Sequence, residues 1–276
     1  MRPIFVTFAA AMANDSNRKI IIKTPEQIAG IRESGKLAAS TLAYLKPLVQ
    51  PGITTAYLDK KCKEFIFDHQ ALPATLHYHS FPSSCCTSIN DVVCHGIPDN
   101  KTVLRDGDIL NIDVTTIYNG YFGDTCTMFK VGEVSAYASN LMKVAKCCLD
   151  EGLKQCYNGN RLSNIGKAIE KHARANGCSV VFEFCGHGVG LSFHEEPEVC
   201  HNSETHRDYT LKPGMVFTVE PMINAGKART KIDKWDNWTA RTIDGKLSAQ
   251  YEHTLCITES GGPEILTLEM EDLVEF

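Results

Sequence analysis

Two aspartates in the segment ILNIDVTTIYNGYFGDTCTMF could bind a metal ion together. The pair Asn119-Gly120 is a strong signal for a two-residue β-turn, because both positions favour positive φ. Counting back from that turn places Asp113 opposite Cys126 and makes Asp113 and Asp124 diagonal neighbours on one face. Converging carboxylates repel each other unless a cation lies between them. The segment therefore predicts a divalent-cation site, and the open alternative is an edge hairpin with both aspartates in solvent.

Three further side chains of metal-binding type stand in short, distinctive segments: His187 in FCGHGVG, Glu220 before a proline, and Glu252 in SAQYEHT. The glycines beside His187 allow close approach of a ligand. Histidines without such surroundings are interpreted as structural: His69, His172, His201 and His206. Four carboxylates and one imidazole call for two divalent ions, roughly 3.5–4 Å apart in hydrolytic sites. Mixed oxygen and imidazole donors suit Mn, Fe, Co or Zn alike.

An internal duplication would bring these distant ligands together. The segments LRDGDILNID and LKPGMVFTVE share a pattern that ends in a carboxylate, and their glycines, Gly107 and Gly214, are 107 positions apart. The same offset relates Gly52 to Gly159, each before an amphipathic helical pattern. Coincident glycines in ordinary patterning are the alternative. A true duplication predicts a pseudo-twofold axis that receives a ligand from each half.

The elements that must position the ligands follow from this reading. Each half reads as a helix, a glycine turn, a second helix and antiparallel strands, which is an α/β (α+β) fold class. The halves cover roughly 25–135 and 136–262, within a single catalytic domain over 23–276. The helices are expected near 25–46, 54–70, 136–157 and 162–176.

Composition narrows the class of protein. The 276 residues are 43% hydrophobic, enough for one large core or two small ones, and the net charge of −5 gives no basic field for nucleic acid or an anionic membrane. No apolar run approaches the roughly 20 residues that span a bilayer. The twelve cysteines follow no spacing typical of a disulfide framework, and the sequence has no CxxC motif. A protein of a reducing compartment is therefore favoured over a secreted protein held together by disulfides.

Residues 1–22 form an N-terminal extension in this interpretation. Their short apolar stretch resembles a secretory or transit peptide but is broken by Pro3 and Thr7. A cytoplasmic location is therefore expected, with organellar targeting by this extension as the alternative.

The motifs together resemble those of type I, bacterial-like methionine aminopeptidases, from about Lys23 to Thr267. They are NDVVCHGIP, DGDILNIDVT, GYFGDT, CGHGVG, FHEEP, GMVFTVEPMIN and SAQYEHT, in that order. The resemblance implies the pita-bread fold and metal-dependent removal of the initiator methionine, by a metal-bridging water or hydroxide, with a small second residue preferred. It implies nascent polypeptide N-termini as partners, leaves ribosome association open, and implies a monomer that needs neither nucleic acid nor membrane.

The resemblance also assigns roles to residues. The implied metal ligands are Asp113, Asp124, His187, Glu220 and Glu252. Glu220 would also shuttle a proton, His194 would stabilise the oxyanion, and His95 would meet the amide nitrogen. The implied methionine pocket is lined by Tyr78, Phe81, Cys86, Phe193 and Trp238.

Departures from the family pattern leave the fine selectivity of that pocket open. Ser80 stands where glycine is expected, Phe81 where tyrosine is common, and Thr75 where some members have cysteine. Two rival hypotheses stay open: a proline-specific peptidase of the same fold, and a non-catalytic binding protein on the same scaffold. The latter typically loses metal ligands, and all five positions are filled here.

Overall fold

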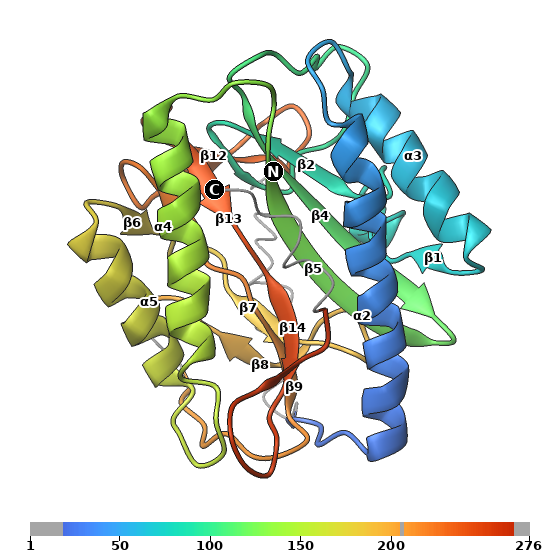
Figure 1. Cartoon of the computed structure of the whole chain (residues 1–276). Coiled ribbons are helices and arrows are strands. Elements are labelled where there is room, and N and C mark those ends of the chain that lie inside the picture. The colour runs from blue at the N-terminus through green and yellow to red at the C-terminus, as the bar shows by residue number, and fades with distance from the viewer. Residues whose placement is uncertain (1–18, 205–206, 268–276) are drawn as a thin grey trace, which may run out of the picture.

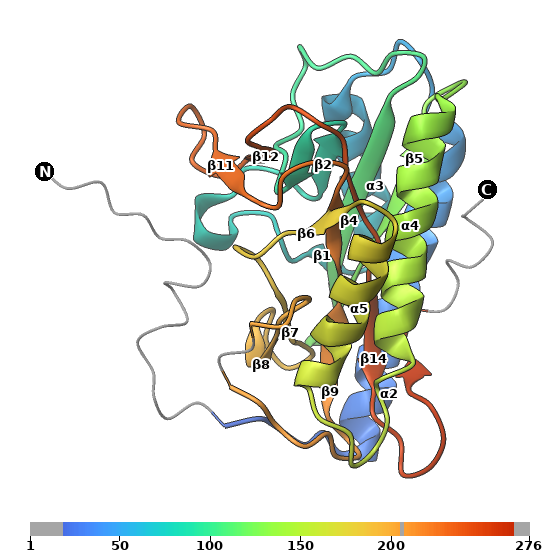
Figure 2. The same cartoon turned by 90° about the vertical axis from the view of Figure 1, so that its left-hand side faces the viewer.

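The computed structural model describes residues 19–204 and 207–267. In Figure 1 two long helices stand on either side of a central group of strands. Figure 2 shows that the β11–β12 hairpin projects from the side of the strands opposite helices α4 and α5. The predicted N-terminal extension lies outside the described residues except for 19–22.

The helices begin and end within a few residues of their expected positions: α2 Pro25–Leu45, α3 Thr55–Asp68, α4 Ala136–Leu153 and α5 Ser163–Ala175, with 3-10 turns η1 Lys46–Leu48 and η2 Tyr78–Ser80. The strands of the first half are β1 Leu72–Pro73, β2 Cys86–Ile89, β3 Val92–Cys94, β4 Ile109–Tyr118 and β5 Tyr121–Lys130. Those of the second half are β6 Ser179–Val180, β7 Gly186–Gly188, β8 Glu195–Val199, β9 Val216–Val219, β10 Met222–Asn224, β11 Thr230–Ile232, β12 Ala240–Thr242, β13 Ser248–Gln250, β14 His253–Cys256 and β15 Glu264–Ile265.

Local sequence explains where the helices start. Thr24 caps α2 in a capping box with Gln27, and a proline follows at the first helical position. Thr54 caps α3 and Ser135 caps α4, each by accepting a backbone N–H three residues on. The start of α5 lacks a side-chain cap, and Asp208 accepts the Ser163 N–H at 2.9 Å instead.

The predicted hairpin register is confirmed. Asn119 and Gly120 have φ of 50° and 82° at the turn. Strands β4 and β5 pair in the expected register, with Asp113 opposite Cys126 and Thr115 opposite Asp124. The two aspartates therefore lie on the same face of the hairpin, as diagonal neighbours.

The duplication is confirmed by matching backbone hydrogen bonds. Gly52 N–H donates to Leu104 O at 2.8 Å, and Gly159 N–H donates to Leu211 O at 2.9 Å. The isolated bridges of the two halves also match, Thr54 with Val103 and Arg161 with Thr210. Each of these pairs is related to its counterpart by the offset of 107. All four repeat glycines have left-handed φ: Gly52 90°, Gly107 94°, Gly159 87° and Gly214 81°.

Each half has its own core, and strands cross between the halves. One buried cluster joins α2 and α3 to β4 and β5, and another joins α4 and α5 to β9, β10 and β14. Strand β3 of the first half pairs with β12 of the second, a connection that no sequence pattern predicted. At the seam, Glu252 N–H donates to Cys126 O at 3.2 Å and Thr254 Oγ1 donates to Asp124 O at 2.7 Å.

The twelve cysteines all lie in the described part of the chain, and none forms a disulfide. Among the helices of residues 19–204 and 207–267, none has the length and apolar character needed to cross a bilayer.

Helix α2 packs against β5 at a pair of glycines. A Cβ on Gly123 would lie 2.2 Å from the backbone nitrogen of Gly35, which is rigid helix backbone. We expect Gly123→Ala to lower the free energy of unfolding by about 1–3 kcal/mol or more, because α2 must move away from the strand. Urea denaturation measures the loss. Gly262→Ala, where a Cβ would meet nothing within 4 Å, is the control and should stay within about 0.5 kcal/mol of the parent.

Candidate metal centre

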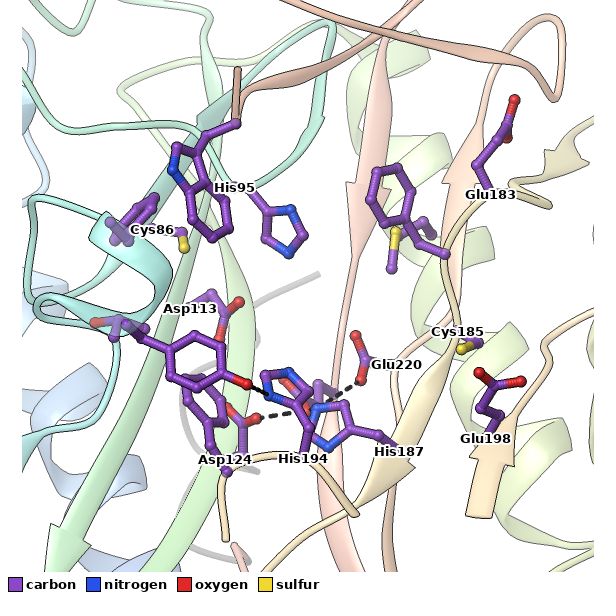
Figure 3. A pocket seen from close by; sticks show the side chains of 18 residues that line it. Cys86, His95, Asp113, Asp124, Glu183, Cys185, His187, His194, Glu198 and Glu220 are labelled. Carbon is purple, nitrogen blue, oxygen red and sulfur yellow. Dashed lines mark hydrogen bonds and ion pairs between the residues drawn. The ribbon is translucent and has the colours of Figure 1, made fainter. Parts of the chain in front are cut away.

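One cavity between the two halves collects every predicted site residue. It contains about 840 Å³ of empty space, part of it open to solvent. Figure 3 shows Asp113, Asp124, His187 and Glu220 around its lower part, with His95 above them. Residues from both halves line the cavity: Tyr78, Phe81, Cys86, His95, Asp113, Asp124, His187, Phe193, His194, Glu220, Trp238 and Glu252. Lining the cavity does not by itself assign a role to any of these residues.

The acidic residues converge at the seam. Oxygen atoms of Asp113, Asp124 and Glu252 all lie within 4.8 Å of one another. His187 Nε2 lies 3.5 Å from Asp124 Oδ2 and 3.7 Å from Glu220 Oε1. Dashed lines mark these contacts in Figure 3. Four carboxylates and one imidazole thus form a single cluster, three of whose members come from the second half.

Hydrogen bonds hold two carboxylates of the cluster, those of Asp124 and Glu220, in place. Thr115 Oγ1 donates to Asp124 Oδ1 at 2.7 Å, and Thr218 Oγ1 donates to Glu220 Oε1 at 2.7 Å. Gln250 Nε2 donates to the other oxygen of Glu220 at 3.2 Å. These neighbours leave few rotamers open to the carboxylates, which is how surrounding groups orient metal ligands.

One buried carboxylate oxygen indicates that the cluster is suited to a cation. Glu252 is 2% exposed, and its Oε1 has no hydrogen-bond partner among the described residues. A buried carboxylate oxygen without a partner costs free energy. The donor set therefore fits divalent ions, which would satisfy this oxygen and offset the repulsion among the carboxylates.

The pKa values of the clustered carboxyl groups show that burial and mutual repulsion disfavour their charged forms. Removal from water raises the pKa of Asp113 and of Glu252 well above the usual range, and nearby carboxylates raise both further. Burial raises the pKa of Glu220 to about 7, although His187 opposes the shift. Burial lowers the pKa of His187, but a hydrogen bond to Asp124 and the charge of Glu220 outweigh burial and raise it overall.

Two other histidines border the cluster without joining it. His194 Nδ1 lies 2.9 Å from the Tyr78 hydroxyl, and its ring centroid lies 4.2 Å from that of His187. Burial and the neighbouring His187 hold the pKa of His194 well below its ordinary value, so the ring is neutral near pH 7. Burial also lowers the pKa of His95 to about 4.

An aromatic wall adjoins these histidines. The ring of Phe81 meets that of Trp238 edge-on at 5.2 Å, and Phe193 lies 4.8 Å from Tyr78. Cys86 is buried beside Asp113, with which it pairs directly where β2 lies along β4. Such apolar, aromatic and sulfur-lined surroundings suit an unbranched thioether side chain.

Sequence reasoning missed five residues that line the cavity: Glu183, Phe184, Cys185, Glu198 and Met222. Phe184 and Cys185 stand three and two positions before His187, and Met222 stands two positions after Glu220, so proximity to those predicted ligands was an available signal. Glu198 gave no local signal, because it reaches the site by pairing with His187 across β7 and β8. His201, interpreted from the sequence as structural, is buried and accepts the Glu220 N–H at 3.1 Å, a structural role at the backbone beside the site.

Comparison with known proteins identifies a family of metallopeptidases. The pattern of metallopeptidase family M24 matches residues 29–259. A methionine aminopeptidase of Escherichia coli strain K12 is 49% identical over 256 residues, covering 92% of this chain and 96% of that protein. The crystal structure of methionine aminopeptidase from Rickettsia prowazekii superposes with a TM-score of 0.88 at 45% identity, covering 91% of this chain and 100% of the other.

A structure of lower sequence identity is similar to this chain in its fold. The Xaa-Pro dipeptidase from Bacillus anthracis superposes with a TM-score of 0.71 at 21% identity, over 90% of this chain and 62% of that one. The family pattern spans both halves and the whole cluster, and the high identity extends over nearly the full length of the relatives. This chain belongs to metallopeptidase family M24 and, within it, to the methionine aminopeptidases.

Proposed function

We propose that this chain is a metal-dependent exopeptidase that removes the N-terminal methionine from nascent proteins and peptides and prefers a small second residue. The observation that carries the proposal is the position of the carboxylate–imidazole cluster directly beside an aromatic, sulfur-lined cavity. The cluster supplies hydrolytic chemistry and the cavity supplies recognition of a thioether. The similarity to methionine aminopeptidases of Escherichia coli and Rickettsia prowazekii supports the same activity.

The protein residues have separate tasks in this reaction. Asp113, Asp124, His187, Glu220 and Glu252 would hold the ions. Divalent ions bound there would supply an activated water and Lewis acidity. We infer that two ions bind, drawn from Co, Mn, Fe or Zn, because the donors carry four carboxylates.

Proton transfer and charge stabilisation fall to three side chains. Glu220, fixed by Thr218 and Gln250, is positioned to take a proton from the attacking water and return it to the leaving amine. When the Tyr78 hydroxyl donates to His194 Nδ1, the neutral imidazole carries its proton on Nε2 and can donate it to the developing oxyanion. His95, on the opposite side of the cavity, would meet the amide nitrogen of the scissile bond.

The organisation around this site is also part of the proposal. We assign residues 23–276 to one catalytic domain, supported by the pairing of β3 with β12 across the halves, and residues 1–22 to an extension. Nascent N-termini are the proposed partners of a cytoplasmic monomer that requires neither nucleic acid nor membrane, in keeping with the net charge of −5. Ribosome association is left open, and the indole of Trp235, 97% accessible, would be available to a partner.

Competition between two peptides tests the proposed substrate. Under identical metal loading we expect Met-Ala-Ser to be hydrolysed and Ala-Pro-Ala to be left intact, with free amino acids measured by mass spectrometry. Met-Lys-Ser should be cut poorly, because we expect a centre crowded with ions and their ligands to penalise a bulky second residue. Faster release of the residue before proline would favour the proline-specific alternative. No hydrolysis of either peptide with ions bound would favour a binding protein.

Removing one acidic ligand tests the metal assignment. Asp113→Ala or Asp124→Ala should lower the metal content per chain and reduce hydrolysis to background, because the remaining donors cannot hold both ions. Elemental analysis by mass spectrometry measures the content. Glu183→Gln changes a cavity carboxylate outside the cluster and should retain the full metal content. A parent protein that stays fully active after rigorous chelation contradicts the assignment.

The metal-free protein should lose stability as pH rises. Glu220 has a folded pKa of about 7 against an ordinary value of 4.5, so the native state binds its proton more tightly than the unfolded chain. Its stabilising effect is complete below about 4.5 and is lost by about 7. Urea denaturation of chelated protein across this range should show the decline, and Glu220→Gln should reduce it. Glu33→Gln on exposed helix surface is the control, and an equal decline in the Glu220 variant would contradict this origin.

A further inference from the structure

A buried ion pair joins the N-terminal segment to the loop that carries Phe193 and His194. Lys23 Nζ contacts a carboxylate oxygen of Glu195, and the two residues are 4% and 8% exposed although 172 positions apart. Such a pair is weak evidence for stability, but leaving either charge alone would be costly. Its two partners are therefore constrained to remain together.

The Glu195 carboxylate also closes the loop on itself. Its Oε1 accepts the N–H groups of Leu191 and Ser192 at 2.7 and 2.8 Å, while Oε2 contacts Lys23. His194 directly precedes Glu195, so the orientation of this carboxylate constrains the backbone that presents the imidazole. The conformation of the loop and the position of Lys23 are thus coupled through one side chain.

The other end of the loop is attached to the metal-binding hairpin. Gly190 O accepts the N–H of Phe122, two residues before Asp124 on β5, at 2.9 Å. A Cβ on Gly190 would lie 2.3 Å from Ile31 Cδ1, so the loop also packs closely against α2. Between these two anchors, the Phe193 ring lies 4.3 Å from that of His194.

Lys23 is itself held by the strand that leads to another ligand. Its N–H donates to Gly214 O at 2.8 Å, and Ile22 pairs with Met215. Strand β9 follows and ends one residue before Glu220. The segment at Lys23 therefore connects the His194 loop to the strand that presents a proposed proton carrier.

We propose that Lys23 and Glu195 are positioning residues that fix His194 over the metal cluster. This proposal rests on the proposed function. Neither residue lines the cavity, so both act through the loop and not on substrate. Because a misplacement near 1 Å can cost roughly 100-fold in rate, release of the loop should lower kcat more than it raises KM.

The deciding experiment compares Lys23→Met in two backgrounds. In the parent chain, with metal content equal to that of the parent, we expect kcat for Met-Ala-Ser to fall roughly 10- to 100-fold. In a His194→Ala background the same substitution should change kcat less than about twofold, because the side chain it positions is already absent. Equal losses in both backgrounds, or no loss in the parent background, overturn the proposal.

Further variants guard against misfolding. If Lys23→Met fails to fold, judged by circular dichroism, Glu195→Gln enters the same comparison, because it keeps the shape of the side chain and removes its charge. Lys23→Arg keeps the positive charge and should largely retain kcat. Arg32→Met breaks a half-exposed pair between α2 and Glu264 and serves as the matched control, with kcat unchanged.

Hydrogen exchange tests the pair independently of catalysis. In Lys23→Met the amides of Leu191 and Ser192 should exchange faster, while those of β4 keep their protection. Unchanged exchange at both amides overturns the proposal even if activity falls. If the parent hydrolyses no methionyl peptide, the proposed function fails and the exchange result alone decides whether the pair fixes the loop.

Discussion

Repulsion among four carboxylates is the constraint around which the rest of this protein is organised. Asp113, Asp124, Glu220 and Glu252 converge with one imidazole, where the raised pKa values of three of them express the cost of holding like charges out of water. Two of the acids are held by neighbours, Asp124 by Thr115 and Glu220 by Thr218. A cluster built in this way favours the binding of divalent cations, since the donors are brought together during folding.

The duplication explains how the donors come to one point. Each half forms its own helix-covered core, and the two halves meet where β5 lies against the segment before β14. Matching turns at Gly52 and Gly159 set matching strand positions, so Asp113 and Glu220 approach the seam from opposite sides. The site thus lies between the two halves, a common kind of location for ligand sites.

Backbone strain gathers beside the same seam. Four non-glycine residues near the cavity have left-handed φ: His77, His79, Ser80 and His95. Ser80, at φ 71°, occupies a position where the family pattern has glycine, which suits that conformation without the penalty of about 1–2 kcal/mol expected for other residues. Surrounding contacts must compensate, among them the hydrogen bond from Phe81 N–H to Tyr78 O at 2.8 Å. Backbone hydrogen bonds within residues 77–81 therefore help to hold this wall of the pocket in its strained conformation.

The sequence by itself determined the local elements and the types of donor. Glycine turns and hydrophobic period predicted four helices, Asn119-Gly120 predicted the hairpin with its register, and the constant offset predicted two equivalent halves. These features depend on neighbours close in the chain, or on the repetition of a pattern, and both are visible in one dimension. Only the tertiary structure decided which side chains meet across long separations: Glu198 opposite His187, His201 beneath Glu220, and β3 beside β12. The same holds for Lys23 and Glu195, because a contact over 172 residues depends on how two cores pack and leaves no periodic trace in the sequence.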